Sequence, residues 1–327
     1  MKGHMNVIET LLEHKANPQA RDADRSTPLH FSAAAGHAPV LQRLIKELVS
    51  TGHSGGAMAN AKTNDENTPL QLAAAHGQEP VVEVLLELNA EVDCRNKDRV
   101  TPLLSAAEWG HTEVTKRLLA ARADIEASDK DGWRAIHYAC SKNRWGVVKL
   151  LCEQGAKLGA TANDGNTPLH LAAAIGDHKL VKDLWARNVN LNAANDLGNR
   201  ALHLAALAGH NEAVKVLLTA GVKTDTAGYL GDTAVHMAAA GGHRPVVVTL
   251  ISANCSVNLG NEKSLTPLHK AAQAGKYFVI GHLISAGADT EAVDWLRRTP
   301  YSIAKNQATK DALSIPRRME TRVGLRT

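Results

Sequence analysis

Residues 163–176 read NDGNTPLHLAAAIG, and the chemistry of this stretch decides the fold. The Asn-Asp-Gly run favours a tight turn. Thr167 can cap a helix through its hydroxyl, and Pro168 fits the first helical turn, where no N–H is needed. The apolar residues that follow predict a short helix with a narrow inward face. Gly176 then ends this helix by accepting the left-handed conformation.

A second helix is expected directly downstream, because Leu180, Val181 and Leu184 recur at helical spacing. Such a helix cannot bury its apolar stripe alone. The pattern recurs along the chain in steps of 33 residues, with equivalents of Thr167 at Thr68, Thr101, Arg134, Arg200, Thr233, Thr266 and Thr299. One more copy, at Thr27, lies 41 residues before Thr68, which predicts an eight-residue insertion at about residues 50–57. We expect a Gly-rich surface loop there.

The composition agrees with a packed chain of short helices. Hydrophobic residues make up 44% of the 327 residues and charged residues 21%, which is typical of a soluble globular protein and excludes a disordered or membrane protein. Aromatic residues make up 3%, so Ala, Leu, Val and Ile must fill the core. Helices with such small side chains can approach closely. A repeat array also explains the length, because each unit buries its core against its neighbours.

Charge and cysteine content favour an intracellular protein. The net charge of +4 comes from 37 basic residues interspersed among 33 acidic ones, which gives no nucleic-acid signal. The four cysteines form no CxxC pair and are expected to be reduced thiols. Cys94 and Cys255 lie near turns, where they are expected to be exposed. No apolar run reaches the roughly 18 residues that span a bilayer. We therefore expect a cytoplasmic monomer, with the nucleus as an alternative location.

The repeated motif resembles the ankyrin-repeat family, whose pattern runs D-G-x-T-P-L-H-x-A-A-x-x-G-H and continues into an apolar second helix ending in G-A-D-V-N. The resemblance covers residues 3–313. It implies an all-α solenoid of paired antiparallel helices with short β-hairpin fingers. The expected array, at residues 1–315, has a partial repeat at 3–21, full repeats starting near 22, 63, 96, 129, 162, 195, 228 and 261, and a partial repeat at 294–315. A basic tail, 316–327, follows.

Some repeats depart from the family pattern. Arg134 and Arg200 replace the capping Thr, Asn143-Arg144 replaces Gly-His, and residues 228–231 replace the usual Asp-Gly turn. We expect these units to be less well capped and to fold through their neighbours.

The sequence argues against an enzyme. Eleven of the sixteen histidines sit at repeated positions, either in the T-P-L-H motif or after the turn glycine, where the resemblance implies a structural role. No metal site, cofactor or small-molecule substrate is therefore predicted. Residues 52–56 satisfy the G-x-S-x-G pattern of a serine hydrolase around Ser54. We reject that hypothesis, because the pattern requires a strand before it and a helix after it, and this stretch lies in an insertion.

The resemblance implies that partners bind the concave surface formed by the finger tips and the solvent side of the first helices. The residues expected there are Val100, Glu108, Trp109, Lys130, Trp133, Lys142, Ile175, Leu197, Leu207, Tyr229 and Leu230. Trp109 and Trp133, from consecutive repeats, are expected side by side, as an exposed aromatic cluster of the kind that concentrates binding energy. The alternative is that either ring folds back over a poorly capped neighbour.

We therefore predict a protein–protein interaction module or adaptor whose partner is unknown. The alternative is the ankyrin portion of a larger regulatory protein, such as a ubiquitin-ligase adaptor, a kinase or a channel, because the first repeat lacks its first helix. The arginines near the end, from Arg297 to Arg326, could contact phosphates, but no basic stripe or stacking aromatic accompanies them, which makes a nucleic-acid partner unlikely.

Overall fold

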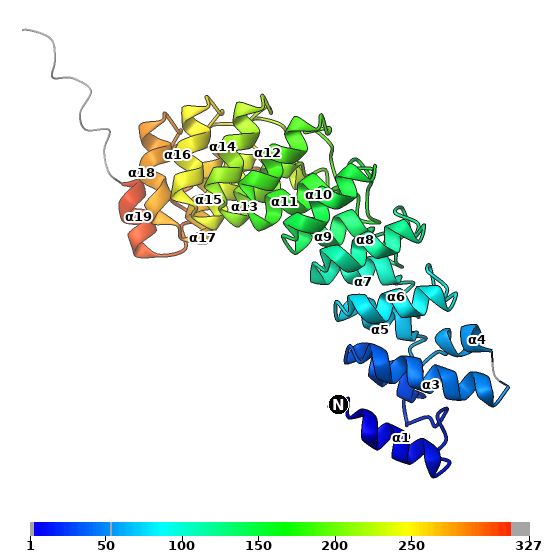
Figure 1. Ribbon diagram of the computed structural model, residues 1–327. Coiled ribbons are helices and arrows are strands. Elements are labelled where there is room, and N and C mark those ends of the chain that lie inside the picture. The colour runs from blue at the N-terminus through cyan, green and yellow to red at the C-terminus, as the bar shows by residue number, and fades with distance from the viewer. Residues whose placement is uncertain (1–2, 53, 315–327) are drawn as a thin grey trace, which may run out of the picture. The chain divides into compact units, whose positions relative to one another are not determined.

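The structure, a computed structural model, describes residues 3–52 and 54–314, and it consists of short helices joined by non-helical fingers (Figure 1). The chain divides into two compact units, Met1–Asn163 and Asp164–Thr327. Within each unit the helices come in antiparallel pairs. The first helix of a pair is the inner helix, which packs on the inner helices of neighbouring pairs, and the second is the outer helix.

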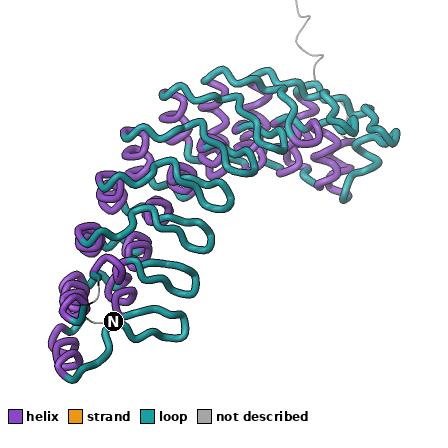
Figure 2. The backbone as a smooth tube through the Cα atoms, turned by 90° about the vertical axis from the view of Figure 1, so that its right-hand side faces the viewer, coloured by secondary structure: helices purple, strands orange, loops and turns teal. Residues whose placement is uncertain are grey.

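The helices of the first unit follow the predicted order. Its inner helices are α2 (Pro28–Ala34), α5 (Pro69–Ala75), α7 (Pro102–Trp109) and α9 (Ala135–Ser141). Its outer helices are α1 (Met5–Glu13), α3 (Ala38–Ser50), α6 (Glu79–Glu87), α8 (Thr112–Ala120) and α10 (Trp145–Glu153), and a short helix, α4 (Gly55–Ala59), follows α3. The fingers of this unit project from one side of its helices (Figure 2).

The second unit repeats the arrangement. Its inner helices are α11 (Pro168–Ile175), α13 (Ala201–Ala208), α15 (Ala234–Gly241) and α17 (Pro267–Ala274). Its outer helices are α12 (His178–Ala186), α14 (Asn211–Thr219), α16 (Arg244–Ser252), α18 (Tyr277–Ser285) and α19 (Gln307–Leu313), and one finger contains a 3-10 turn, η1 (Tyr229–Gly231).

Small and branched apolar side chains form the core, as the composition predicts. Ala172 and Ala173 of α11 are fully buried, and so are Val181 and Leu184 of α12. Burying a Val or Leu side chain stabilises the fold by about 1.5–3 kcal/mol. The alanines contribute less burial but allow adjacent inner helices to pack closely.

The fingers are hairpin turns rather than paired strands. In the finger that carries Asp129, the backbone N–H of Asp129 donates to Trp133 O at 3.1 Å, and Ser128 and Arg134 form an isolated antiparallel bridge. Within residues 3–52 and 54–314 the fingers otherwise lack strand structure (Figure 2). Successive fingers are linked through their backbones instead. Lys130 N, for example, donates to Asp98 O at 3.0 Å.

In the repeats that carry one, the motif histidine ties its repeat to the next, as the resemblance implies. His170 Nε2 lies 3.0 Å from Asn199 O, and its Nδ1 accepts the backbone N–H of Thr167 at 3.1 Å. Because Nδ1 accepts an N–H while Nε2 faces a carbonyl oxygen, the ring is neutral with its proton on Nε2. Burial lowers the pKa of this ring, and it does the same at four equivalent positions, His30, His203, His236 and His269.

A second set of hydrogen bonds joins the start of an outer helix to the inner helix of the preceding repeat. His111 Nε2 lies 3.1 Å from Ala75 O. In the next repeat, where Asn143-Arg144 replaces Gly-His, Arg144 Nε donates to Glu108 O at 3.0 Å. The guanidinium therefore provides the inter-repeat hydrogen bond that the histidine provides elsewhere.

The two arginines that replace the capping threonine bond to the residues that lead into the next finger. Arg134 Nη1 donates to Thr161 O at 3.0 Å, and Arg200 Nη1 donates to Ala227 O at 2.9 Å. An arginine has no acceptor atom with which to cap a helix. Its long side chain instead donates a hydrogen bond to the backbone just before the next finger.

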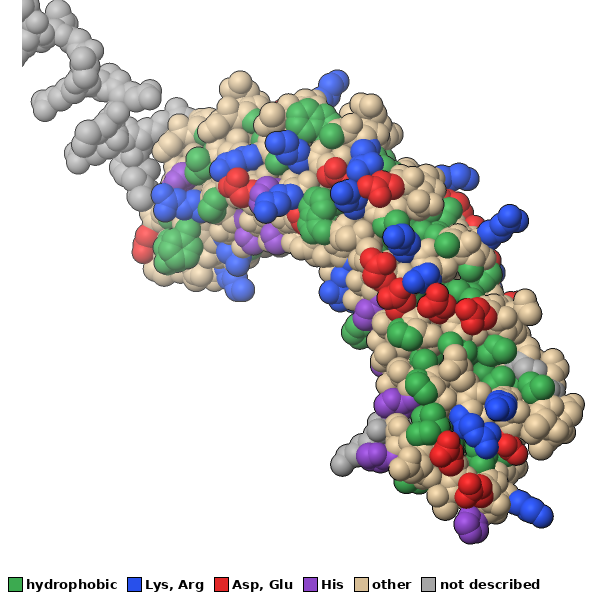
Figure 3. Space-filling model, in the orientation of Figure 1, with side chains coloured by type: hydrophobic (Ala, Val, Ile, Leu, Met, Phe, Trp, Pro, Cys, Tyr) green, Lys and Arg blue, Asp and Glu red, His purple; other side chains and the backbone are tan. Residues whose placement is uncertain are grey.

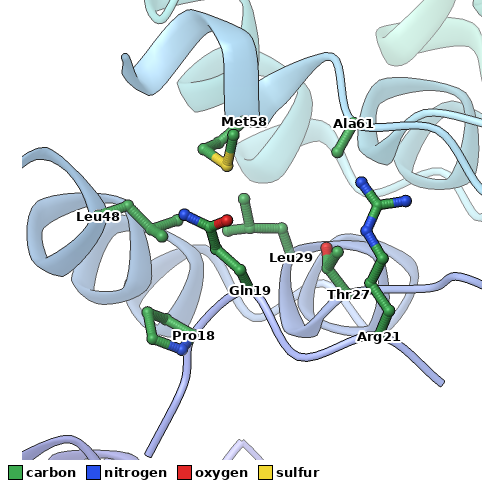
Figure 4. A pocket seen from close by; sticks show the side chains of 8 residues that line it. All are labelled: Pro18, Gln19, Arg21, Thr27, Leu29, Leu48, Met58 and Ala61. Carbon is green, nitrogen blue, oxygen red and sulfur yellow. The ribbon is translucent and has the colours of Figure 1, made fainter. Parts of the chain in front are cut away.

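The insertion is a short helix and not the loop that its glycines predict. Ser54 is the N-cap of α4, and its Oγ accepts the backbone N–H of Ala57 at 3.5 Å. Ala59 is fully buried. Beneath α4, the side chains of Gln19, Leu29 and Met58 point toward one another around a cavity of about 30 Å³ (Figure 4). That volume holds about one water molecule, which is too small for an organic ligand.

Candidate functional site

One exposed position recurs at the tip of successive fingers and forms a register, which we call the fingertip column. Its members lie three residues before the Thr or Arg that precedes each inner helix. In the first unit the column consists of Asp24, Asp65, Asp98 and Asp131. In the second unit it consists of Asp164, Leu197, Leu230, Lys263 and Leu296. The same position is therefore acidic in one unit and largely apolar in the other.

In the first unit, neighbouring lysines pair with the column. Lys130 Nζ lies 2.7 Å from Asp98 Oδ1, and Lys97 Nζ lies 3.8 Å from Asp65 Oδ1. The hydrogen bond from Lys130 to Asp98 raises the pKa of the lysine. Each pair joins two successive fingers. The predicted binding residue Lys130 thus already has a partner inside the protein.

In the second unit, the column exposes large apolar side chains. Leu197 is 56% exposed and Leu296 is 49% exposed. The residues just before the column add two aromatic rings, because Tyr229 is 48% exposed and Trp295 is 60% exposed. Repeated exposure of large apolar side chains at one structural position is typical of an interaction surface.

Leu230 is held in a strained conformation. Its φ is 55°, in the left-handed region, and the next residue, Gly231, also has a positive φ of 74°. A leucine in this region costs roughly 1–2 kcal/mol because its Cβ crowds the backbone. The finger nevertheless keeps Leu230 exposed, while its carbonyl accepts the backbone N–H of Glu262 at 3.1 Å. Exposed strain of this kind commonly marks a functional position.

Two further predicted residues lie at the ends of inner helices. Ile175 is the last residue of α11, and Leu207 is the next-to-last residue of α13, which packs against α11. Both side chains are exposed. The second unit thus contains five of the predicted residues, Ile175, Leu197, Leu207, Tyr229 and Leu230, all with exposed side chains.

The two tryptophans of the first unit differ. Trp109, the last residue of α7, is 56% exposed. Trp133 is half-buried, and its ring lies 5.2 Å from the ring of Tyr138 and 6.3 Å from that of His137, centroid to centroid. The aromatic contacts of Trp133 among the described residues are thus with its own repeat and not with Trp109. The ring thus packs within its own repeat, whereas the alternative interpretation placed it over a poorly capped neighbour.

The other predicted residues of the first unit have partners within the fold. Lys142 Nζ lies 3.8 Å from Glu108 Oε1, an ion pair between neighbouring repeats. Val100 is half-buried, and its carbonyl accepts from Gln71 Nε2 at 2.6 Å. These contacts connect repeats to one another.

The sequence interpretation missed three exposed residues. Leu296 follows Leu230 by two steps of 33 residues, so the repeat alignment could have revealed it. Tyr277 and Phe278 begin outer helix α18, with their rings 3.9 Å apart, and Phe278 is 61% exposed. They were missed because only fingers and inner helices were considered.

The described residues include side-chain types that can ligate a metal ion, and cysteine thiols. Among residues 3–52 and 54–314, no three His, Cys, Asp or Glu side chains are placed to hold a metal ion. Cys94 and Cys255 are buried, which corrects the expectation of exposure. Burial raises the pKa of Cys94 to about 11 and that of Cys255 to about 12. Both thiols therefore stay protonated near neutral pH and are poor nucleophiles.

On the visible face, basic and acidic side chains are intermixed (Figure 3). None of the helices in the described part of the chain combines the length and the hydropathy needed to cross a bilayer.

Comparison with known proteins agrees with this architecture. The family model described as ankyrin repeats (3 copies) matches residues 1–96, 88–162, 156–227 and 220–294. The chain belongs to the ankyrin-repeat family. Among solved structures, the crystal structure of the human ASB11 ankyrin repeat domain is similar to it, with 27% identity and a TM-score of 0.60 over 68% of this chain and 95% of that one. A search of curated proteins gave no match.

Membership of the ankyrin-repeat family has a general functional meaning. Ankyrin repeats are generally protein–protein interaction modules. The family does not specify the partner, because the scaffold is shared while the exposed side chains vary. The exposed residues of this chain must therefore carry any more specific proposal.

Proposed function

We propose that this ankyrin-repeat protein is a non-enzymatic adaptor that binds a protein partner through the fingers of residues 164–314. The observation that carries the proposal is the change of the fingertip column from aspartates, two of which are paired with lysines, to exposed Leu197, Leu230 and Leu296. A cytoplasmic or nuclear location is part of the same proposal.

The contact surface is proposed to combine the fingertip leucines with the aromatic rings beside them. Tyr229 and Trp295 are the kind of side chain that dominates interface energies, because each buries a large area at a small entropic cost. Ile175 and Leu207 extend the apolar surface to the inner helices. The charged finger of Glu262 and Lys263 lies in the register between the two apolar groups, and we propose that it sets polar specificity.

Trp109 is proposed as an additional contact on the first unit. It is exposed, whereas Trp133, Glu108, Lys130 and Lys142 are engaged within the fold. We therefore assign the four engaged residues mainly to stability and only Trp109 to binding.

The test uses substitutions that the fold already accepts. Leu197→Asp, Leu230→Asp and Leu296→Asp give the column the residue that it has in the first five fingers. The triple variant and the wild type are compared by affinity capture from lysate of the source cell with quantitative mass spectrometry, and circular dichroism checks folding. The control is Leu259→Asp, because Leu259 is also exposed but lies outside the column.

We expect the triple variant to lose a discrete set of proteins that the control variant retains. Replacing several central apolar contacts by charges should weaken binding by about 100-fold or more. Retention of the same proteins by a folded triple variant would place the partner elsewhere, and the Trp109→Ala variant would then be compared in the same way.

A further inference from the structure

The exposed face of two outer helices loses a polar side chain near the end of the second unit. The central solvent-facing position of each outer helix recurs with the repeat and is polar at Gln42, Glu83, Lys116, Lys149, Lys182 and Lys215. In α16 and α18 the same position holds Val248 and Gly281. The polar side chain of this one position is therefore missing from these two helices.

A groove lies between α16 and α18. It has about 440 Å³ of open space and is lined by Val248, Ile251, Ser252, Gly281, His282, Ser285 and Ala286. A Cβ added to Gly281 would meet no atom within 4 Å, so the glycine is not required by packing within the protein. Tyr277 and Phe278 add two exposed rings at the start of α18.

The charges on the two helices that form the groove have one sign. Neither α16 nor α18 contains Asp or Glu, and Arg244 at the start of α16 is exposed, with its Nε donating to His282 Nε2 at 3.1 Å. On neighbouring α14, Glu212 is paired with Lys215 at 2.7 Å. On neighbouring α19, Asp311 accepts a hydrogen bond from Gln307 at 2.7 Å. Arg244 is thus the charge available to a ligand in the groove.

The dimensions favour a short helical segment. Each of the two helices has nine residues, which corresponds to a length of roughly 13.5 Å. Two such helices side by side, each about 10 Å across, present roughly 270 Å², which is well below the area of about 800 Å² per partner of a stable interface with a second copy. An extended peptide would find no open strand edge there to satisfy its backbone, whereas a helix satisfies its own backbone groups.

We propose that the groove between α16 and α18 binds a short amphipathic helix of another protein, with its apolar face beside Val248 and Phe278 and an acidic side chain on Arg244. This surface belongs to the outer helices. It is separate from the fingers and does not depend on the function proposed for them.

The experiment selects peptides with the full-length chain. A display library of 12-residue peptides with strong helix propensity is selected on the wild type and counter-selected on the Val248→Lys, Gly281→Lys variant. These lysines reproduce the residue found at the same position in the four preceding repeats, so the variant should fold. Phe278→Glu serves as a second variant, because Glu212 and Glu113 occupy that position in other repeats. Binding is measured by fluorescence anisotropy.

We expect selected peptides to carry apolar residues at i, i+3 or i+4 together with Asp or Glu. Their affinity should fall about ten-fold or more for both groove variants and for Arg244→Glu. Ala186→Lys, which adds a lysine to the exposed surface of α12, should leave the affinity unchanged.

Three outcomes would overturn the proposal. In the first, the selection yields no peptide that distinguishes the wild type from the folded groove variants. In the second, the selected peptides lack acidic residues and ignore Arg244→Glu. In the third, sedimentation shows a dimer that the Val248→Lys, Gly281→Lys variant converts to a monomer, which would assign the groove to a second copy.

Discussion

Lys270 of α17 reaches back to the finger that precedes α15, where its Nζ lies 2.6 Å from Oδ2 of Asp232. Asp232 is buried, and its other carboxylate oxygen accepts from Asn261 Nδ2 at 2.7 Å. The position of Asp232 holds Asn199 one repeat earlier. The position of Lys270 holds Leu204 two repeats earlier. The ion pair is therefore a local alternative to the polar and apolar residues used elsewhere.

This ion pair predicts a non-additive result. Lys270→Leu leaves a buried carboxylate without its cation, which should cost about 3 kcal/mol of unfolding free energy. The double variant Asp232→Asn, Lys270→Leu should return to within about 1 kcal/mol of the wild type, because no charge remains buried. Urea denaturation of the wild type, Lys270→Leu, Asp232→Asn and the double variant measures the coupling, and additive effects would show that the pair contributes nothing as a pair.

Leu230 should limit stability. Leu230→Asn places a residue that tolerates the left-handed region at φ 55° and should raise the unfolding free energy by about 1 kcal/mol. Under the proposed function, the same change should weaken partner binding. Leu197→Asn is the control, since Leu197 is exposed in the same column but has no positive φ. Equal stability effects of the two substitutions would argue against strain at Leu230.

Substitution of Trp133 should lower stability, whereas substitution of Trp109 should leave stability almost unchanged. Trp133→Ala removes the ring that packs against Tyr138 and should lower the unfolding free energy by about 2 kcal/mol. Trp109→Ala removes an exposed ring and should change stability by less than about 0.5 kcal/mol. Thermal unfolding followed by circular dichroism distinguishes them, and a similar loss in both variants would contradict the assignment.

The buried histidines predict a specific acid sensitivity. Burial lowers the pKa of His30, His170, His203, His236 and His269 below the ordinary value of about 6.5, so the unfolded chain binds protons more readily than the native chain. Their stabilising contribution is complete above that value and is lost as the pH falls from it to the lowered native pKa. Each ring contributes a slope of up to about 1.4 kcal/mol per pH unit in this window.

A matched substitution tests this pH dependence. His170→Gln should reduce the slope of stability against pH below about 6.5, because glutamine does not titrate. It should keep the fold, since Gln71 occupies the same position in an earlier repeat and donates from Nε2 to Val100 O. His14→Gln, at an exposed histidine, is the control. An unchanged slope in His170→Gln would show that the buried ring does not titrate in this window.

The sequence predicted the fold well because its determinants are local. Caps, turns and helical spacing near Thr167 recur in register, and the histidine ties follow from that register. The inter-repeat roles of Arg134 and Arg200 could not be predicted, because they depend on where a long side chain meets the next finger. The helix after Ser54 was missed because Gly55 and Gly56 have poor helix propensity, which the packing of Ala59 overrides.

The candidate site was predictable in part. The repeat alignment places Leu197 and Leu230 at exposed fingertips without any coordinates. It does not reveal which exposed residues already have partners. Trp133 turns toward Tyr138, and Lys130 pairs with Asp98, through side-chain orientations that the repeat period does not encode.

The direction of the histidine ties has a consequence for synthesis on the ribosome. His30 bonds to Ala61 and Asn67, and His236 bonds to Leu265, so each motif histidine obtains its acceptor from sequence made later. At about 5–20 residues per second, those acceptors emerge roughly 2–6 seconds after the histidine. The histidine ring of a nascent repeat thus lacks its hydrogen-bond acceptor until the next repeat has left the exit tunnel. The speed of translation determines how long this state lasts.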